Sequence, residues 1–390
     1  MVRQASLFSQ LIAFFNRNKF KNLVLAHKTE RYSKGFKSWD QFVAMLFCQV
    51  AQAKSLREIS GGLACCMGKL RHLGVCDAPS RSTLSYANKN RSWKLFRDLF
   101  YDTFDYCRKA CPGKHKFKFK NKLLSLDSTT ISLCLNMFPW AKFRRTKGAV
   151  KLHLLLDHDG YLPSYAYISN GRKHEATFAR KFPLAPGSIV AMDRGYQNYK
   201  LFGFWTAQKI YFVTRDKKNT GYEVLSEQRL PNTGNILSDQ IIMFKGYYGR
   251  KNCPFPLRRI TVWDDQNRKQ IAIVTNHFEF GATTISEIYK DRWQIELFFK
   301  AIKQNLRIKT FVGTSENALY IQIWTALIAM LLIKFFQIKS KFNWSLSNLV
   351  AFLRWNLFSY KDLWEWLDKP FDVLPEAPPP MQMQLPFKGI

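Results

Sequence analysis

Residues 122–133 read KLLSLDSTTISL, an apolar run that ends in an acid, Asp127, and continues with β-branched residues. This composition is typical of a strand. Residues 150–168, VKLHLLLDHDGYLPSYAYI, alternate around an Asp-Gly turn and predict a hairpin. A helix over 174–182 and a second apolar strand within 187–197, GSIVAMDRGYQ, come next. The order strand, hairpin, helix, strand predicts a mixed α/β sheet.

Helical patterns precede this sheet. Apolar residues recur at three- and four-residue steps through 38–52 and again through 92–107, so residues 1 to about 115 are predicted to be helical. Between them, 55–63 (SLREISGGL) and 78–91 (APSRSTLSYANKNR) indicate a helix, a Gly-rich break and a second helix that starts at a Ser. The pattern resembles a helix-turn-helix DNA reader, and the alternative is an ordinary helical hairpin.

Strand-like segments return after the second acidic strand. They lie between about 210 and 275 and are separated by a polar stretch that contains Gly and Asn. Helices are expected from about 284 to 368, before a Pro-rich tail that we predict to be flexible. Residues 318–333, ALYIQIWTALIAMLLI, are nearly uncharged but shorter than the ~20 residues of a membrane span. We therefore expect a buried core helix there and no membrane anchor.

Charge is the strongest global signal. The chain of 390 residues has a formal net charge of +32, and its basic residues are spread along the whole length. A protein this basic repels itself unless it meets a polyanion, so nucleic acid is the leading partner and an anionic membrane the second. The 8 cysteines show no C-x2-C pair, which disfavours a structural zinc site. Reduced thiols and the lack of a secretory signal predict a cytoplasmic protein.

Two acids stand directly after apolar strand runs. Asp127 follows LLSL and Asp193 follows IVAM. In open α/β sheets, functional groups collect at the carboxyl ends of strands, where an acid projects from a rigid edge. The alternative for either residue is a turn or N-cap aspartate, which is the commoner use of Asp at such positions.

A third acid lies in residues 289–303, YKDRWQIELFFKAIK, which we predict to be one buried helix with Trp293 in the core. At roughly 100° per residue, Arg292, Glu296 and Lys303 share one narrow stripe with Tyr289. A buried carboxylate is costly unless it is paired or binds metal. Glu296 is therefore either the partner of Arg292 one turn away or a metal ligand with basic neighbours for phosphate.

Three carboxylates from two strands and one helix suit a two-metal phosphoryl-transfer site. Mg²⁺ prefers carboxylate oxygens and keeps positions open for water and phosphate. Two such ions about 4 Å apart can activate an attacking oxygen and stabilise a leaving one. No phosphate-binding loop, HExxH or GxSxG motif competes with this constellation in the sequence.

The spacing Y-x2-R-x3-E-x6-K, formed by Tyr289, Arg292, Glu296 and Lys303, resembles the signature of a large group of bacterial insertion-sequence transposases, the insertion sequence "four" type. These are DDE enzymes with an RNase H-like catalytic domain. Asp127 in LDSTT and Asp193 in AMDRGY are similar to the other two catalytic acids of that family. The resemblance covers roughly 120–340, and the first hundred residues resemble the helical N-terminal domain of some members.

The resemblance implies three regions. Residues 1–115 would form an all-α domain that binds DNA, and 116–345 an RNase H-like catalytic α/β domain with a β-rich insertion at about 205–278. C-terminal helices and the Pro-rich tail would occupy 346–390. The implied cofactor is Mg²⁺, as two ions held by Asp127 and the other two acids, and Mn²⁺ can substitute.

The implied activity is cut-and-paste DNA transposition in the bacterial cytoplasm, at the nucleoid. A homodimer would pair two inverted-repeat ends, nick each end to free a 3′-OH, pass through a hairpin, and join the 3′ ends to target DNA. By this analogy Arg292 and Lys303 hold phosphates near the cut, and Tyr289 contacts the DNA backbone. The further basic residues that we expect to contact DNA are Lys300, Arg194, Lys147 and Lys151.

Two alternatives to a transposase stay open from the sequence. One is a structure-specific nuclease on the same fold, and the other is a catalytically silent DNA-binding protein that descends from a transposase. His174 is expected either to support the acids or to face solvent. The remaining acids of these segments, Asp157, Asp159 and Asp291, are predicted to be turn or surface residues.

Overall fold

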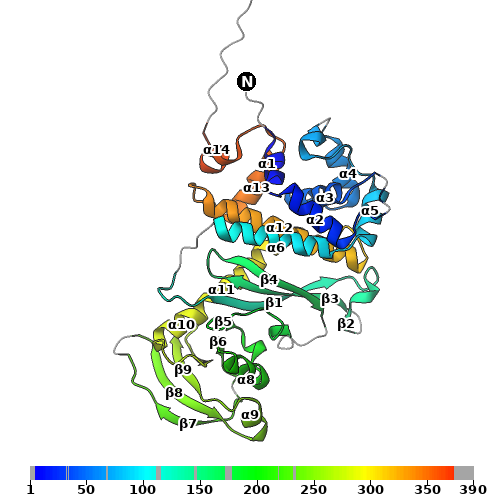
Figure 1. Cartoon of the computed structure of the whole chain (residues 1–390). Coiled ribbons are helices and arrows are strands. Elements are labelled where there is room, and N and C mark those ends of the chain that lie inside the picture. The colour runs from blue at the N-terminus through cyan, green and yellow to red at the C-terminus, as the bar shows by residue number, and fades with distance from the viewer. Residues whose placement is uncertain are drawn as a thin grey trace, which may run out of the picture.

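The computed structural model describes residues 5–31, 33, 35–66, 69–110, 116–144, 147–171, 178–217, 219–231 and 234–372. Within these ranges, helices from both ends of the chain form one layer on top of a sheet, and the sheet continues downwards into the part drawn in yellow-green (Figure 1). The predicted mixed α/β architecture, with a helical N-terminal region and C-terminal helices, is confirmed. Residues 174–177 of the predicted helix over 174–182, His174 among them, lie outside the description, and the described remainder, 178–182, is one short helical turn followed by a turn and a bend.

All the described strands belong to one sheet. They are β1 (Leu123–Leu133), β2 (Lys142–Arg144), β3 (Lys147–Asp157), β4 (Leu162–Asn170), β5 (Ile189–Met192), β6 (Tyr211–Arg215), β7 (Tyr222–Glu227), β8 (Ile236–Phe244), β9 (Leu257–Asp264) and β10 (Lys269–Thr275). The order across the sheet is β2-β3-β1-β5-β6-β10-β9-β8-β7, with β4 paired to β3. Strand β3 is antiparallel to both of its neighbours, β1 and β4, whereas β5 is parallel to β1 and β6 is parallel to β5. The first half of the sheet therefore has the RNase H-like arrangement.

The hairpin predicted around the Asp-Gly pair is confirmed. Strands β3 and β4 are antiparallel, with Asp157 opposite Leu162, and Gly160 has a φ of 81° that suits a residue without a Cβ. The range 205–278, predicted to hold a β-rich insertion, contains β7, β8 and β9, and these extend the same sheet beyond β6 and β10.

The described helices lie before, between and after the strands of the sheet. They are α1 (Leu7–Ala13), α2 (Arg17–His27), α3 (Ser38–Val50), α4 (Leu56–Ala64), α5 (Arg81–Asn90), α6 (Lys94–Ala110), α8 (Tyr199–Ala207), α9 (Tyr247–Asn252), α10 (Ala282–Asp291), α11 (Trp293–Asn305), α12 (Glu316–Lys339), α13 (Leu346–Asn356) and α14 (Leu363–Asp368). Helix α12 is the one described helix that is long and apolar enough to cross a membrane, yet most of it is buried inside the fold. It packs against α3, α5, α6 and α13, so it is the core helix that the sequence predicted.

The N-terminal helices close onto the C-terminal ones. The backbone N–H groups of Leu7 and Phe8 donate to the carbonyl oxygens of Ser359 and Leu357, at 3.1 and 2.8 Å. The side chain of Gln10 donates to the carbonyl of Lys361 at 2.7 Å. The two ends of the described chain therefore belong to one helical layer.

Helices α4 and α5 form the predicted helix pair, but its Gly-rich break is not a break. Gly61 and Gly62 lie inside α4. A Cβ on Gly62 would come within 2.8 Å of the ring of Phe47 on α3, so the glycine allows close helix packing. The chain between the helices instead contains a short 3₁₀ helix, Lys69–Leu73.

Candidate active site

Two adjacent strands bring the first two acids together. Strands β1 and β5 are parallel neighbours, and Leu126 pairs with Met192. Asp127 and Asp193 are the next residues on each strand, at a spacing of ~4.8 Å between strands. Asp127 itself is half-buried, and it follows four buried residues of β1, Leu123–Leu126, so the sheet fixes its backbone.

The third acid comes from a helix that differs from its prediction. Residues 289–303 are not one helix, because α10 ends at Asp291 and α11 begins at Trp293, with Arg292 between them. Trp293 is 55% exposed and Leu297 is 43% exposed, so the prediction of a core Trp293 and of burial nearly all round is wrong. Residues 293, 297, 300 and 304 form an outer face, while the opposite face packs on β1 and α13.

These elements enclose a pocket of about 500 Å³ beside the ends of the two strands. Its lining contains Asp127, Ser128, Thr129, Asp193, Arg292, Glu296, Phe299, Lys300 and Lys303. All three predicted acids and three of the predicted basic residues therefore meet in one place. The sequence analysis missed Ser128, Thr129 and Phe299, although the first two directly follow Asp127 and could have been found from that position.

The surroundings of Asp127 in the pocket disfavour its negative charge. Burial, with added repulsion from the carboxylates of Asp193 and Glu296, raises the pKa of Asp127 to about 7, although the N–H of Ser128 and the charge of Arg292 act to lower it. The N–H of Ser128 donates to Asp127 Oδ1 at 2.7 Å. Such a carboxylate gains from any cation that enters the pocket.

Arg292 is buried at the centre of this group. Its Nη2 donates to Glu296 Oε1 at 2.7 Å, so the ion pair that the sequence allowed is formed. Its side chain is 10% exposed, whereas that of Glu296 is 34% exposed. Among the described residues, neither Nε nor Nη1 of Arg292 finds a hydrogen-bond partner. A buried guanidinium with unused donors suits an anionic group such as phosphate.

The acids fit a divalent metal by donor type more than by their present positions. In the described part of the chain no three His, Cys, Asp or Glu side chains are close enough to hold one ion together. In a two-ion site, however, each ion needs only two of the three carboxylates, and Glu296 is turned towards Arg292. The carboxylate oxygens, the pocket volume and the raised pKa of Asp127 fit hard divalent ions.

Lys303 lies in the lining of the pocket, whereas Tyr289 lies outside it, beside Arg292. Lys303 Nζ donates to the carbonyl of Thr130 at 3.3 Å, and burial together with the nearby charge of Lys309 lowers its pKa. Tyr289 does not line the pocket. The guanidinium carbon of Arg292 lies 5.5 Å from its ring centre, and burial raises the pKa of the phenol.

Besides Tyr289, three more of the predicted DNA-contacting residues lie outside the pocket. Arg194 is exposed in the 3₁₀ turn that follows Asp193, and Lys147 is exposed at the start of β3. Lys151 is half-buried on β3, opposite Thr130 of β1. None of the three lines the pocket that holds the acids.

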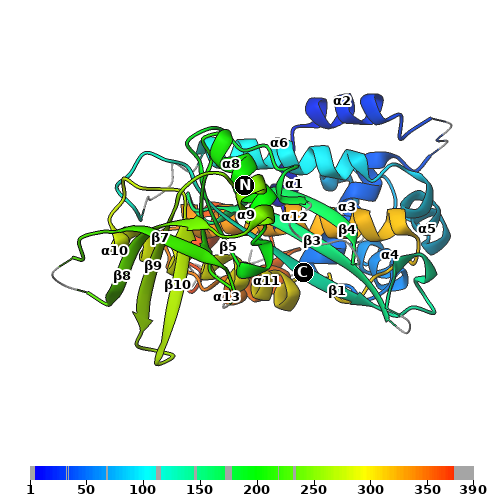
Figure 2. The same cartoon turned by 90° about the horizontal axis from the view of Figure 1, so that it is seen from below.

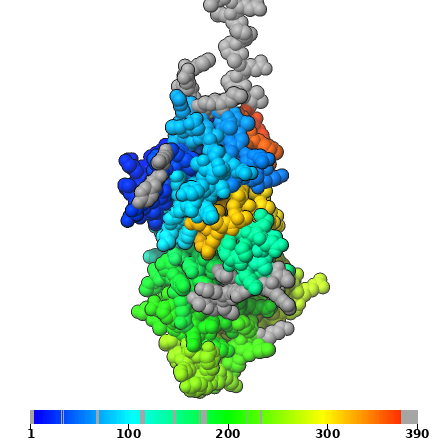
Figure 3. Space-filling model, turned by 90° about the vertical axis from the view of Figure 1, so that its right-hand side faces the viewer, coloured from blue at the N-terminus to red at the C-terminus, as the bar shows by residue number. Residues whose placement is uncertain are grey.

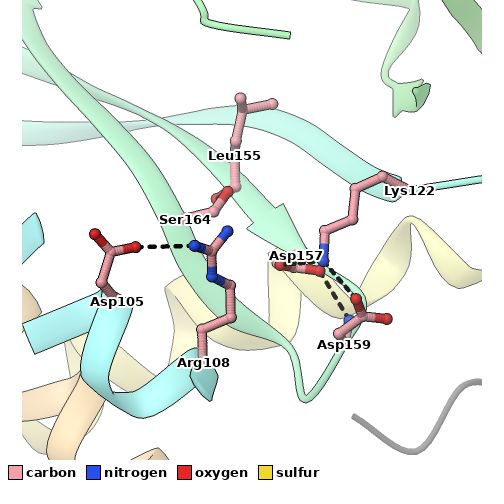
Figure 4. A network of polar contacts seen from close by, with 7 residues as sticks. All are labelled: Asp105, Arg108, Lys122, Leu155, Asp157, Asp159 and Ser164. Atoms are coloured by element: carbon pink, nitrogen blue, oxygen red, sulfur yellow. Dashed lines mark hydrogen bonds and ion pairs between the residues drawn. The ribbon is translucent and has the colours of Figure 1, made fainter. Parts of the chain in front are cut away.

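The prediction of a turn or surface residue is wrong for Asp291, which is buried at the end of α10, whereas Asp157 belongs to the turn as predicted but is buried. Asp157 has a side chain that is 2% exposed and pairs with Lys122 Nζ at 2.6 Å, while Asp159, in the turn as predicted, shares the same lysine (Figure 4). Lys122 lies immediately before β1, so this contact joins the hairpin turn to the residue that precedes that strand. The sequence gives no sign of the contact because the partners are far apart in the chain.

Asp291 is the centre of a larger buried cluster. Its carboxylate accepts from Lys116 at 2.6 Å and from Tyr161 at 3.0 Å, and it lies 2.7 Å from His158 Nδ1. The other ring nitrogen of His158 lies 2.7 Å from Ser125 Oγ on β1. Burial acts to raise the pKa of Asp291, but the hydrogen bonds from His158 and Lys116 hold it at about 2.

Comparison with known proteins agrees with this geometry. Residues 118–332 match the family model "Transposase DDE domain", and residues 3–76 match a "Domain of unknown function (DUF4372)". A protein of Sinorhizobium fredii named as a transposase, y4zB, is 31% identical over 263 residues, 66% of this chain and 71% of that protein. A Geobacillus stearothermophilus protein named for transposition of insertion sequence element IS5377 is 30% identical over 277 residues, 70% of this chain and 72% of its own.

A solved structure with a similar outline is the synaptic complex of piggyBac transposase with hairpin DNA. It has a TM-score of 0.47 and 10% sequence identity, and the alignment covers 96% of this chain and 84% of that one. A likeness of this size carries no inference about the present chain.

Proposed function

Because the chain belongs to the family of proteins with a transposase DDE domain, we propose that the pocket beside β1, β5 and α11 is where this transposase cuts and joins DNA. The observation that carries the proposal is the meeting of Asp127, Asp193 and Glu296 with Arg292 in one pocket. Carboxylates at strand ends with a buried cation beside them suit phosphodiester chemistry.

DDE transposases depend on divalent metal, and we propose Mg²⁺ as two ions, with Mn²⁺ as a substitute. Asp127 would take part in holding both ions, one with Asp193 and the other with Glu296. The ions would supply the positive charge that activates the attacking oxygen and stabilises the leaving oxygen of the phosphodiester. Glu296 has to release part of its contact with Arg292 to do this, and the side chain is exposed enough to turn.

The basic residues of the pocket are proposed to hold the DNA. Arg292 has unused buried donors for a phosphate oxygen next to the reacting bond, and Lys300 and Lys303 line the same pocket. The aromatic ring of Tyr289 would support the Arg292 guanidinium through a cation–π contact. Arg194, Lys147 and Lys151 would meet the DNA backbone further along.

In the proposed reaction, water attacks the phosphodiester at each end of the element. The 3′ oxygen of the element strand leaves as a 3′-OH, and the flanking strand keeps the 5′-phosphate. That 3′-OH then attacks a target phosphodiester, forms the new bond and releases a target 3′-OH. The partners would be duplex DNA with terminal inverted repeats, target DNA and a second copy of the chain. The N-terminal helices would add DNA contacts, and the protein would act at the nucleoid in the bacterial cytoplasm.

The test is a cleavage and strand-transfer assay on paired element ends with Mg²⁺. Asp127→Ala, Asp193→Ala and Glu296→Gln should each abolish both products while a gel shift with the same DNA persists. Wild-type strand-transfer products separate a transposase from a nuclease on the same fold. If any one of the three variants still cuts at the wild-type rate, the assignment of the acids is wrong.

A further inference from the structure

A second pocket lies between the helical layer and the sheet, apart from the pocket that contains the acids. It has a volume of about 340 Å³, and none of its lining residues also lines the acid pocket. Its walls come from α6 and the residue before it, from β4 and from the first half of α12. These three elements contact one another, and Figures 1 and 2 show α6 and α12 side by side along the sheet. In Figure 3, α12, in yellow to orange, reaches the surface between the helical layer and the green part of the sheet.

The second pocket is lined mainly by aromatic rings. The indole rings of Trp93 and Trp324 are parallel within 4°, with 6.4 Å between their centres. Trp324 is 2% exposed, whereas Trp93 is half-buried. A flat ring can stack on such side chains, so the lining favours a planar aromatic group as the ligand. The aromatic residues of the lining are Trp93, Tyr101, Tyr165, Tyr167, Tyr320 and Trp324.

The charges of the second pocket disfavour a cation as the ligand. Asp98 is the one carboxylate among the described lining residues, and both of its oxygens are engaged. Arg97 Nε donates to Oδ1 at 2.6 Å, and His27 Nε2 lies 2.7 Å from Oδ2. The guanidinium carbon of Arg97 lies 5.7 Å from the ring centre of Trp93. A bound cation would therefore meet the positive charge of Arg97 without a free carboxylate to offset it.

Two lining residues keep hydrogen-bond donors that the described part of the chain does not use. The indole Nε1 of Trp324 is buried and has no partner among the described residues. The guanidinium of Arg97 uses Nε for Asp98, which leaves its two Nη groups without an acceptor in the same residues. A buried donor without an acceptor is costly, and a pair of Nη groups suits a phosphate or a carboxylate. The ligand should therefore supply acceptors on its ring and an anionic group.

Acidic side chains around the second pocket favour a small free ligand over a DNA strand. Asp102 follows Asp98 by one turn of α6. On the α12 side, burial together with the nearby charge of Glu316 raises the pKa of the Tyr320 phenol. A DNA strand has a negative charge at every nucleotide and would bring several of them close to these carboxylates. A single small anion needs only to reach one cation of the lining.

We propose that the second pocket binds a free mononucleotide, a role separate from the DNA chemistry proposed for the acid pocket. The base would stack among the aromatic rings and offer its ring acceptors to Trp324, and the phosphate would bind the Nη groups of Arg97. A volume of about 340 Å³ is at the lower end for small-molecule sites, which suits one nucleotide better than a larger cofactor. Because the ligand would contact α6, β4 and α12 together, it would stabilise the packing of the helical layer on the sheet.

The first experiment is a calorimetric titration of the full chain with AMP, adenosine and ribose 5-phosphate, in EDTA so that no divalent ion occupies the acid pocket. AMP should bind at least about tenfold more tightly than adenosine, because its phosphate adds charge-assisted hydrogen bonds to Arg97. Ribose 5-phosphate, which lacks the base, should bind at least about tenfold more weakly than AMP. Equal affinities for AMP and adenosine would overturn the inference. So would the absence of binding by all of AMP, GMP, CMP and UMP at about 1 mM.

Substitutions then locate the bound nucleotide. Arg97→Gln should remove the advantage of AMP over adenosine, and Trp93→Ala should weaken the binding of both about tenfold or more through lost stacking. The matched control is Lys94→Ala, an exposed neighbour outside the lining, which should bind AMP within about twofold of wild type. An affinity that falls in Lys300→Ala and not in Arg97→Gln would place AMP in the acid pocket, and the inference would fail. Arg97→Gln keeps every aromatic ring, so it decides the question even if circular dichroism shows that Trp93→Ala does not fold.

A last comparison separates a free nucleotide from one within DNA. A single-stranded oligonucleotide of mixed sequence should change the affinity for AMP by less than about twofold, because the carboxylates around the pocket oppose the strand. Displacement of AMP in proportion to the added strand would show that the pocket takes a nucleotide of DNA, and the free ligand would be wrong. AMP should also raise the melting temperature of wild type and leave that of Arg97→Gln unchanged. Asp127→Asn should bind AMP as wild type does, so the catalytic proposal and this inference can fail separately.

Discussion

Asp127, half-buried on β1, and Asp291, buried at the end of α10, are two carboxylates whose surroundings are opposite. Asp291 receives hydrogen bonds from Lys116 and Tyr161 and contacts His158, and its pKa is held at about 2. Asp127 has the N–H of Ser128 as its close partner and has two carboxylates nearby, and burial with this repulsion raises its pKa to about 7. Asp127 lies on β1 and Asp291 is the last residue of α10. Arg292, which directly follows Asp291, lines the same pocket as Asp127.

Asp291 is a carboxylate that stabilises the fold, whereas Asp127 is a carboxylate whose surroundings favour the binding of a cation. A buried acid with several donors is satisfied inside the protein and gains nothing from a cation. A buried acid with few donors and like charges nearby is stabilised only when positive charge arrives. Asp291, an acid of the first kind, stabilises the junction between α10 and α11. This junction in turn helps to position the pocket that contains Asp127, an acid of the second kind.

The largest expected effect comes from removing the Asp127 carboxylate. Asp127→Asn should reduce DNA cleavage by at least about 10³-fold, because one of the oxygens proposed to hold the metal ions is lost. In the absence of divalent ions its free energy of unfolding should rise, because repulsion with Asp193 and Glu296 disappears. Cleavage assays and urea unfolding check both halves. Mg²⁺ should raise the melting temperature of wild type and leave that of the variant unchanged.

Asp291→Asn should act in the opposite sense. We expect the free energy of unfolding to fall by about 3 kcal/mol, because Lys116 and His158 lose their buried partner. Urea unfolding at neutral pH measures this change. A variant as stable as wild type would show that the cluster is not a support. Lys290→Ala, one position earlier and exposed, is the control and should be neutral.

The stability difference between wild type and Asp291→Asn should depend on pH. The pKa of Asp291, about 2 in the folded protein, lies below the value of about 3.9 in an unfolded chain. Its contribution is therefore complete above the unfolded pKa and is lost as the pH falls through the folded pKa. The stability gap between wild type and Asp291→Asn should narrow by about 1 kcal/mol from pH 6 to pH 3. A gap that widens on acidification contradicts this account.

Tyr161→Phe should give the smallest change. The phenol donates one hydrogen bond to Asp291 Oδ2, at 3.0 Å, and the carboxylate keeps Lys116 and His158 when that bond is lost. We expect a loss of about 0.5 kcal/mol in the free energy of unfolding, at the lower end for one hydrogen bond. Urea unfolding of this variant beside Asp291→Asn shows whether the donors act together. A loss as large as that of Asp291→Asn would mean that the tyrosine organises the whole cluster.

The sequence predicted the sheet and its acids because both depend on local patterns. The apolar run before Asp127 and the one before Asp193 identify strands, and each acid follows directly. The helix that carries Glu296 was found by its spacing, but its exposed side was not. Trp293 and Leu297 are apolar residues on an outer face, so hydrophobicity alone misassigned them.

The cluster around Asp291 could not have been predicted in the same way. Its partners come from residue 116, the hairpin turn and β1, which lie more than a hundred positions away in sequence. Gly62 illustrates the same limit, since its role depends on Phe47 of another helix. Local sequence patterns predict elements, whereas burial of a polar group is decided by which distant segments the fold brings against it.

The contacts of α1 with residues 357–361 set an order on synthesis. The N-terminal helices leave the ribosome first, yet the carbonyl groups that pair with Leu7 and Phe8 belong to Leu357 and Ser359. Helix α12, on which the same layer packs, also comes late. The N-terminal helices therefore reach their final arrangement only when nearly the whole chain has been made. A truncated product that lacks the last helices would leave α1 without its partners at residues 357–361.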